Sequence, residues 1–105
     1  MNKSFMYGVG SLTLLLILCS FAWQKKKLTV WMMGDSTMAI KAESKYPETG
    51  WGVAFATLFH ENVQVNNTAK NGRSTKSFIR EGLWDGVQQG LQKGDYLFIQ
   101  FGHND

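Results

Sequence analysis

The sequence predicts an α/β fold in which a parallel sheet is covered by helices. Two short apolar segments, at 28–33 and 96–101, and a shorter segment at 63–66 are predicted to be strands. Two segments between them, at 52–59 and 78–91, repeat apolar residues at helical spacing. Because strands that alternate with helices pair in parallel, this order of segments indicates one parallel sheet with covering helices.

The first half of the predicted domain begins with a strand from Leu28 to Met33. It is apolar on both faces, which is typical of a strand covered on both sides. A turn and loop follow from Asp35 to Lys45. The helix at 52–59 continues an apolar pattern that starts at Trp51, a residue we expect in the core.

The second half contains a strand from Val63 to Asn66, a loop from Asn71 to Ser74, and the last helix and strand. Ser74 or Thr75 can cap the helix that follows the loop, and Gly94 suits its C-terminal end. Three glycines inside this helix lower its propensity. They are Gly82, Gly86 and Gly90.

Residues 1–22 differ from the rest of the 105-residue chain and have the pattern of a signal peptide. The almost continuous apolar run from Leu12 to Ala22 is shorter than the roughly 20 residues of a membrane span and has the length of a signal-peptide core. Small residues at Ser20 and Ala22 predict cleavage after Ala22, so we expect a secreted or periplasmic protein. The alternatives are an uncleaved membrane anchor and lipidation at Cys19.

The composition of residues 23–105 argues against several functions. The whole chain has a net charge of only +3, and its one basic cluster, Lys25 to Lys27, is expected to be a solvated tail. We therefore expect no nucleic-acid binding. After cleavage no cysteine remains for a disulfide framework or for thiol catalysis. Two scattered histidines are too few for a metal site.

A polar segment follows each predicted strand. The segments are Gly34-Asp35-Ser36, Asn71-Gly72-Arg73-Ser74 and Gly102-His103-Asn104-Asp105. In parallel α/β sheets, ligands bind beyond the carboxyl ends of the strands. We therefore expect these segments to meet at one edge of the sheet and to form the functional site.

The three segments contain the parts of a serine esterase site. Ser36 is a candidate nucleophile at the end of the first strand. The Gly72 backbone N–H can approach a substrate closely, and the Asn104 side chain offers an amide N–H, so both are candidate donors to an oxyanion. Asp35 is expected to brace the turn. Each segment alone is also a common turn or strand end, so the combination in this order carries the prediction.

These motifs resemble the sequence blocks of the SGNH (GDSL-type) hydrolases. Gly34 to Met38 is similar to the first block, Gly72 to the glycine of the second, and Gly102 to Asp105 to the third, Gly-x-Asn-Asp. Three further segments resemble the rhamnogalacturonan acetylesterase branch of this superfamily. They are Tyr46 to Gly52, Asn71 to Phe78, and Gly94-Asp95-Tyr96.

The resemblance implies a flavodoxin-like three-layer α/β/α fold, of which residues 28–105 contain the first three strands. It implies that Ser36 attacks an acetyl ester, with an oxyanion hole formed by the Ser36 N–H, the Gly72 N–H and the Asn104 side chain. The implied substrate is an acetylated polysaccharide or oligosaccharide of the rhamnogalacturonan or pectin type, and no cofactor is required. Arg73 and His103 are further candidates for substrate contacts.

The fourth block of the family, Asp-x-x-His, supplies the general base and its aspartate, and it does not occur in these 105 residues. We therefore expect an N-terminal part of a longer enzyme that is inactive alone. In the implied fold the strand at 96–101 is interior, so here it would be an unpaired apolar edge that is prone to association. His60 is expected at the surface, and His103 is expected to be structural or substrate-lining rather than the base.

Two other functions agree with parts of the sequence. Another SGNH ester hydrolase would use the same residues on lipid esters or on other acetylated glycans. A nucleotide-binding α/β protein would need a glycine-rich phosphate loop after the first strand. Gly34-Asp35-Ser36 has one glycine and places an acidic side chain where a phosphate would lie, which argues against nucleotide binding.

Overall fold

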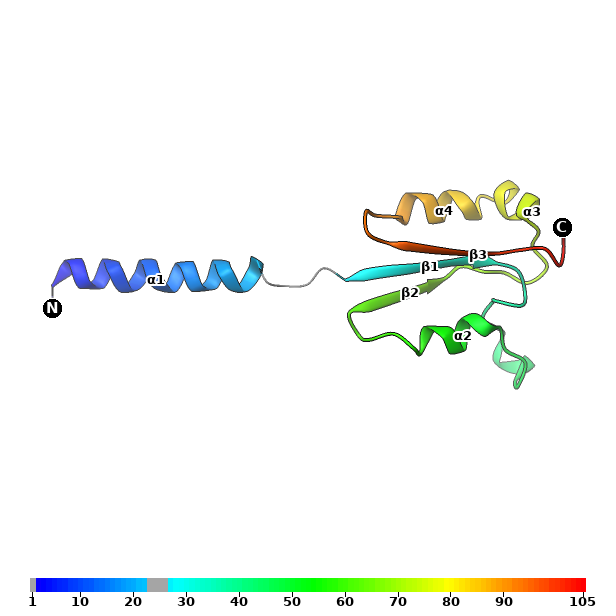
Figure 1. The fold of residues 1–105 in the computed structure, drawn as a ribbon, viewed down its shortest axis with the longest axis horizontal. Coiled ribbons are helices and arrows are strands. Elements are labelled where there is room, and N and C mark those ends of the chain that lie inside the picture. The colour runs from blue at the N-terminus through cyan, green and yellow to red at the C-terminus, as the bar shows by residue number, and fades with distance from the viewer. Residues whose placement is uncertain (1, 23–26) are drawn as a thin grey trace.

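The computed structural model describes residues 2–22 and 27–105, and these contain a parallel three-stranded sheet (Figure 1). β1 (Leu28–Gly34) lies in the middle, with β2 (Val63–Asn67) on one side and β3 (Tyr96–Gln100) on the other. Both pairs run parallel. The predicted α/β class is confirmed, and each predicted strand ends within one residue of its observed end.

Helices cover both faces of the sheet. α2 (Trp51–Ala56) lies on one face, and α3 (Thr75–Arg80) and α4 (Leu83–Gly90) lie on the other (Figure 1). This arrangement confirms the predicted three-layer α/β/α architecture.

Alternate residues of β1 form two small cores. Val30 and Met32 pack with Met38, and partly buried apolar residues cover this cluster. They are Phe55, Phe59, Val63, Val65 and Ala69. On the opposite face the Trp31 ring lies against Gly90 of α4. Because successive side chains of a strand point to opposite faces of the sheet, β1 packs against helices on both faces.

The predicted helix at 78–91 is instead two helices, α3 and α4. Gly82 lies between them with a φ of +76°, a left-handed conformation that breaks the helix and that favours glycine. Gly94 is not at the end of this helix, because α4 ends at Gly90 and Gly94 lies in the turn before β3. Ser74 caps α3 as predicted, since its hydroxyl accepts a hydrogen bond from the Ser77 N–H at 3.1 Å.

α2 is shorter than the predicted helix at 52–59. The Thr57 hydroxyl donates to the Ala54 carbonyl at 2.7 Å, and such a bond competes with the backbone bonds of a helix end. The prediction that Trp51 lies in the core is wrong. It is 41% exposed and contacts the Phe55 ring edge to face, with ring centres 5.5 Å apart.

β3 forms an edge of the sheet in the described part of the chain. Tyr96, Phe98 and Ile99 are 60%, 40% and 60% exposed. The predicted apolar edge is therefore observed, and such an edge offers unpaired backbone groups to another strand.

α1 (Lys3–Ala22) covers the predicted leader. The apolar side chains of residues 5–18 are exposed, and Cys19 carries an exposed free thiol. Within residues 2–22 and 27–105, no helix combines the length and apolar character that crossing a membrane requires. The predicted cleavage site, after Ala22, adjoins residues 23–26, which lie outside the described residues. These include Lys25 and Lys26 of the predicted solvated tail.

We predict that Gly90→Ala lowers the free energy of unfolding by about 1–3 kcal/mol, as overpacked sites do. A Cβ at this position would lie 2.5 Å from Cζ2 of Trp31, and the Trp31 ring is anchored by a 3.2 Å hydrogen bond from its Nε1 to Asp95 Oδ2. Urea unfolding of the variant and the parent protein measures the difference.

Gly86→Ala in the same helix is the matched control. Nothing lies within 4 Å of a Cβ at Gly86, so alanine should stabilise α4 by roughly 0.5–1 kcal/mol. Equal effects of the two substitutions would contradict the contact between α4 and Trp31.

Candidate active site

Three segments meet at the carboxyl ends of β1 and β3. Backbone hydrogen bonds continue past the strand ends: the Asp35 N–H donates to the Gln100 carbonyl at 3.2 Å, and the Lys70 N–H donates to the Gly34 carbonyl at 3.0 Å. The chain segments that leave these positions are therefore held at one edge of the sheet, where the sequence predicts them.

Ser36 is half-buried in a tight turn directly after β1. The Asp35 carbonyl accepts hydrogen bonds from the N–H groups of Met38 and Ala39, at 3.2 and 3.1 Å. Oδ1 of the Asp35 carboxylate accepts hydrogen bonds from the N–H and the hydroxyl of Thr37, at 3.0 and 2.8 Å. Asp35 thus braces the turn that presents Ser36, as predicted.

The Asp35 side chain is fully buried, with 0% exposure. Burial by itself raises the pKa of this carboxyl, but the hydrogen bonds from Thr37 and the nearby N–H and ring of His103 outweigh burial and lower the pKa below its usual value. In the described part of the chain, Asp35 Oδ2 has no partner in regular hydrogen-bond geometry.

Lys41 joins the Ser36 turn to the loop that carries Gly72. Its ammonium group donates to the Ser36 carbonyl and to Asn71 Oδ1, the latter at 2.7 Å. The sequence gives no signal for this role, because a lysine five residues beyond a serine in a loop has no characteristic spacing. Only the folded loop brings Lys41 back to Ser36.

Gly72 lies in the loop after β2 with a φ of +74°. This conformation turns the chain towards α3 and favours glycine, since a Cβ would be strained there. The position is exposed, and nothing lies within 4 Å of where a Cβ would be. A ligand can therefore approach the backbone at Gly72 without obstruction.

Asn104 lies beside the same loop. Its Nδ2 donates to the Arg73 carbonyl at 3.1 Å. The neighbouring carboxylate of Asp105 accepts hydrogen bonds from the N–H and the hydroxyl of Thr75, at 2.7 and 3.2 Å. Since an amide nitrogen carries two N–H groups, one can hold Asn104 against the loop while the second serves a ligand.

Arg73 is engaged within the protein. Its Nε and Nη2 donate to the two carboxylate oxygens of Glu81 at 2.8 and 3.0 Å, and its Nη1 donates to the Asn71 carbonyl at 2.9 Å. The hydrogen bonds from Arg73 lower the pKa of Glu81. In this structure Arg73 is a brace of the Gly72 loop, and a substrate contact would use only its remaining N–H groups.

The two histidines lie in different parts of the fold. His103 is exposed, and its N–H and ring act on the buried carboxyl of Asp35, which agrees with a structural role. His60 is exposed in the turn that enters β2, at the opposite edge of the sheet from Ser36, as predicted. Among residues 2–22 and 27–105, no three His, Cys, Asp or Glu side chains are grouped to hold a metal.

Three curated proteins are similar to this chain. Rhamnogalacturonan acetylesterase RhgT of Bacillus subtilis (strain 168) is 47% identical over 81 residues, which are 77% of this chain and 35% of the relative. A rhamnogalacturonan acetylesterase of Emericella nidulans is 44% identical over 77 residues, 73% of this chain and 28% of the relative. The probable rhamnogalacturonan acetylesterase YesY of Bacillus subtilis (strain 168) is 37% identical over 76 residues, 72% of this chain and 35% of the relative.

No protein-family model matches the chain. The chain spans about a third of the length of the curated relatives that it matches. Within that span, the parallel sheet with its covering helices is that of an SGNH hydrolase. The chain belongs to the rhamnogalacturonan acetylesterase-like family of these hydrolases.

The lowered pKa of Asp35 predicts how stability depends on pH. In the folded state the carboxyl holds its proton less tightly than in the unfolded state. Its contribution is therefore present at neutral pH, above the usual Asp pKa of about 4, and is lost as the pH falls through the lower folded pKa.

We predict that Asp35→Asn is less stable than the parent protein at pH 7 and that the difference shrinks as the pH falls below about 4. Urea unfolding measured between neutral and acidic pH tests this. The contribution of Glu81, whose pKa is also lowered, is common to both proteins and cancels in the difference. A difference that stays constant with pH would contradict the charged, hydrogen-bonded state of Asp35.

Proposed function

We propose that the complete protein is a serine esterase that removes O-acetyl groups from a plant cell-wall polysaccharide of the rhamnogalacturonan or pectin type. The observation that carries this proposal is the hydrogen-bonded meeting of the Ser36 turn, the Gly72 loop and Asn104 at one edge of the sheet. The names of the relatives, all rhamnogalacturonan acetylesterases, support the substrate class.

In the proposed reaction, Ser36 Oγ attacks the carbonyl carbon of the acetyl group and gives its proton to a general base. The carbonyl oxygen becomes an oxyanion, which accepts hydrogen bonds from the Ser36 N–H, the Gly72 N–H and Asn104 Nδ2. The sugar oxygen then leaves with a proton from the base, and an acetyl ester remains on Ser36. Water attacks this ester and releases acetate.

The general base is expected from an Asp-x-x-His block outside these 105 residues. The proposed reaction needs no cofactor, since the nucleophile, the base and the oxyanion donors are all side chains or backbone groups. The contribution of residues 35–41, 71–75 and 102–105 is to hold the nucleophile and the three oxyanion donors in fixed positions.

We further propose that residues 1–22 are a signal peptide and that the enzyme acts outside the cytoplasm. The support is the short apolar core of this segment and the extracellular nature of the proposed polymer. The N-terminal residue of the exported protein, determined by mass spectrometry, distinguishes cleavage after Ala22 from an intact or lipidated leader.

Ser36→Ala in the complete enzyme should lower kcat for acetate release by at least about 10⁴-fold, because the attacking oxygen is lost. Acetate release from acetylated rhamnogalacturonan and from p-nitrophenyl acetate measures the effect. Ser44→Ala removes an exposed hydroxyl from the 3₁₀ helix at Glu43–Lys45 and is the matched control, with unchanged small-ester turnover. Equal rates for Ser36→Ala and the parent enzyme would refute the assignment.

Asn104→Ala should lower kcat by about 10²–10³-fold and change KM little, because an oxyanion donor acts mainly in the transition state. Asn62→Ala, at an exposed position before β2, is the matched control. Unfolding of each variant in urea separates loss of the donor from loss of the hydrogen bond to Arg73. A change confined to KM would make Asn104 a substrate-binding residue instead.

A further inference from the structure

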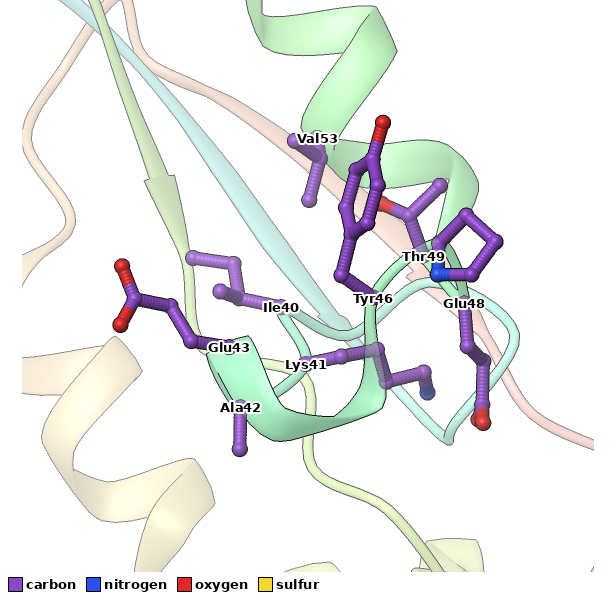
Figure 2. A pocket seen from close by; sticks show the side chains of 9 residues that line it. Ile40, Lys41, Ala42, Glu43, Tyr46, Glu48, Thr49 and Val53 are labelled. Atoms are coloured by element: carbon purple, nitrogen blue, oxygen red, sulfur yellow. The ribbon is translucent and has the colours of Figure 1, made fainter.

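A cavity beside the Ser36 turn has no part in the proposed reaction. It has a volume of about 570 Å³ and lies in the loop between β1 and α2, open to solvent. Figure 2 shows the side chains around it, with the Tyr46 ring standing near Thr49 and Val53, and with Ile40 and Lys41 below the ring. Glu43 and Glu48 also line it and extend to opposite sides in this view.

The part of this loop that follows the Ser36 turn, residues 40–50, is attached to that turn at both of its ends. At the first end, Lys41 lines the cavity and donates to the Ser36 carbonyl. At the second end, the Trp51 N–H donates to the Thr37 carbonyl at 2.9 Å. Gly50 packs on the same turn so closely that a Cβ would lie 2.5 Å from the carbonyl carbon of Met38. The cavity is therefore fixed next to the proposed nucleophile, as in a compact Ω-loop.

The walls of the cavity combine apolar and hydroxyl-binding groups. Tyr46 is 87% exposed and Ile40 is 65% exposed, so both residues offer apolar surface to a ligand. Lys41, Thr49, Glu43 and Glu48 add polar side chains to the lining of the cavity. A pyranose ring has the complementary pattern, with an apolar C–H face and hydroxyl groups at its edge. A few polar groups around an apolar surface are typical of small-molecule sites.

The charges of the cavity select among sugars. Two carboxylates line it against one ammonium group, and that ammonium already donates to the Ser36 carbonyl and to Asn71 Oδ1. A carboxylate on the ligand would therefore meet uncompensated negative charge, whereas hydroxyl groups can donate to Glu43 and Glu48.

We propose that this cavity binds a neutral sugar residue of the polysaccharide, adjacent to the residue whose acetyl group reaches Ser36. The inference rests on the proposed function, because it assigns the cavity to the same polymer. The cavity adds affinity for the polymer and no chemistry, so its loss should affect KM for the polymer and leave small esters unaffected.

The test is Tyr46→Ala in the complete enzyme, with acetylated rhamnogalacturonan and p-nitrophenyl acetate as substrates. We expect KM for the polymer to rise about tenfold, with kcat and small-ester turnover unchanged, since a large aromatic contact surface is lost. Tyr46→Phe keeps the ring and should keep KM within about twofold of the parent value. Leu58→Ala, at a 77% exposed position after α2, is the matched control and should change neither substrate. Equal KM for the polymer in Tyr46→Ala and the parent, or equal losses on both substrates, would overturn the proposal.

A binding experiment separates this inference from the esterase reaction. Deacetylated rhamnogalacturonan oligosaccharides are titrated calorimetrically into the Ser36→Ala variant and into the Ser36→Ala, Tyr46→Ala double variant. Binding that weakens about tenfold in the double variant supports the cavity even if no esterase activity is found. Competition by a neutral oligosaccharide, and none by an oligouronate of equal length, is the expected result. Stronger competition by the oligouronate, or equal binding by both variants, would overturn the proposal.

Discussion

The parallel register between β1 and β3 is the constraint on which the candidate site depends. Gly34 lies opposite Gln100, and the next residue, Asp35, continues the ladder by donating its N–H to the Gln100 carbonyl. A Cβ at Gly34 would collide with that carbonyl, so the strands approach closely only because this residue is glycine. Ser36 and Asn104 follow this fixed pair by two and four residues. A slip in register would separate them.

Polar contacts join the segments beyond the sheet to one another, while Met38 anchors the Ser36 turn in the apolar core. Lys41 ties the Ser36 turn to Asn71, and the Arg73–Glu81 pair ties the same loop to the segment between α3 and α4. The buried Asp35 carboxylate closes the Ser36 turn through Thr37. Such a network positions groups precisely enough for acyl transfer, since small displacements of reacting atoms are costly in rate. Lys41 belongs both to this network and to the lining of the cavity at Tyr46, so one loop can serve both positioning and binding.

Much of the fold follows from local pattern in the sequence. The strands at 28–34 and 96–100 are short, mainly apolar runs, and the strand at 63–67 alternates Val63 and Val65 with polar residues; such patterns are specified locally. The predicted helix at 78–91 fails at Gly82, because a helical apolar pattern can span two helices joined by one left-handed residue. Trp51 fits the helical spacing, yet it is partly exposed beside Phe55, since spacing does not fix how deeply a helix end is buried.

The candidate site was predictable to the extent that it follows from topology. Parallel strands carry their following segments to one edge, so the approach of the Ser36 turn, the Gly72 loop and Asn104 could be inferred from their order. The roles of Lys41, Glu81 and Asp105 could not, because these side chains meet their partners only after the loops close. Arg73 shows the same limit, since its exposure to a substrate depends on Glu81, eight residues later in the chain.

The central claim is that the fold activates Ser36 as a nucleophile. A fluorophosphonate probe tests it directly, because an activated serine oxygen displaces fluoride and forms a stable phosphonate ester. Trypsin releases residues 28–41 as one peptide, and Ser36 is its only serine, so mass spectrometry can assign the label without ambiguity. The account predicts that the native complete enzyme is labelled on Ser36 and that the urea-unfolded enzyme is not. Labelling of another serine in the native enzyme, with an unmodified 28–41 peptide, would contradict it.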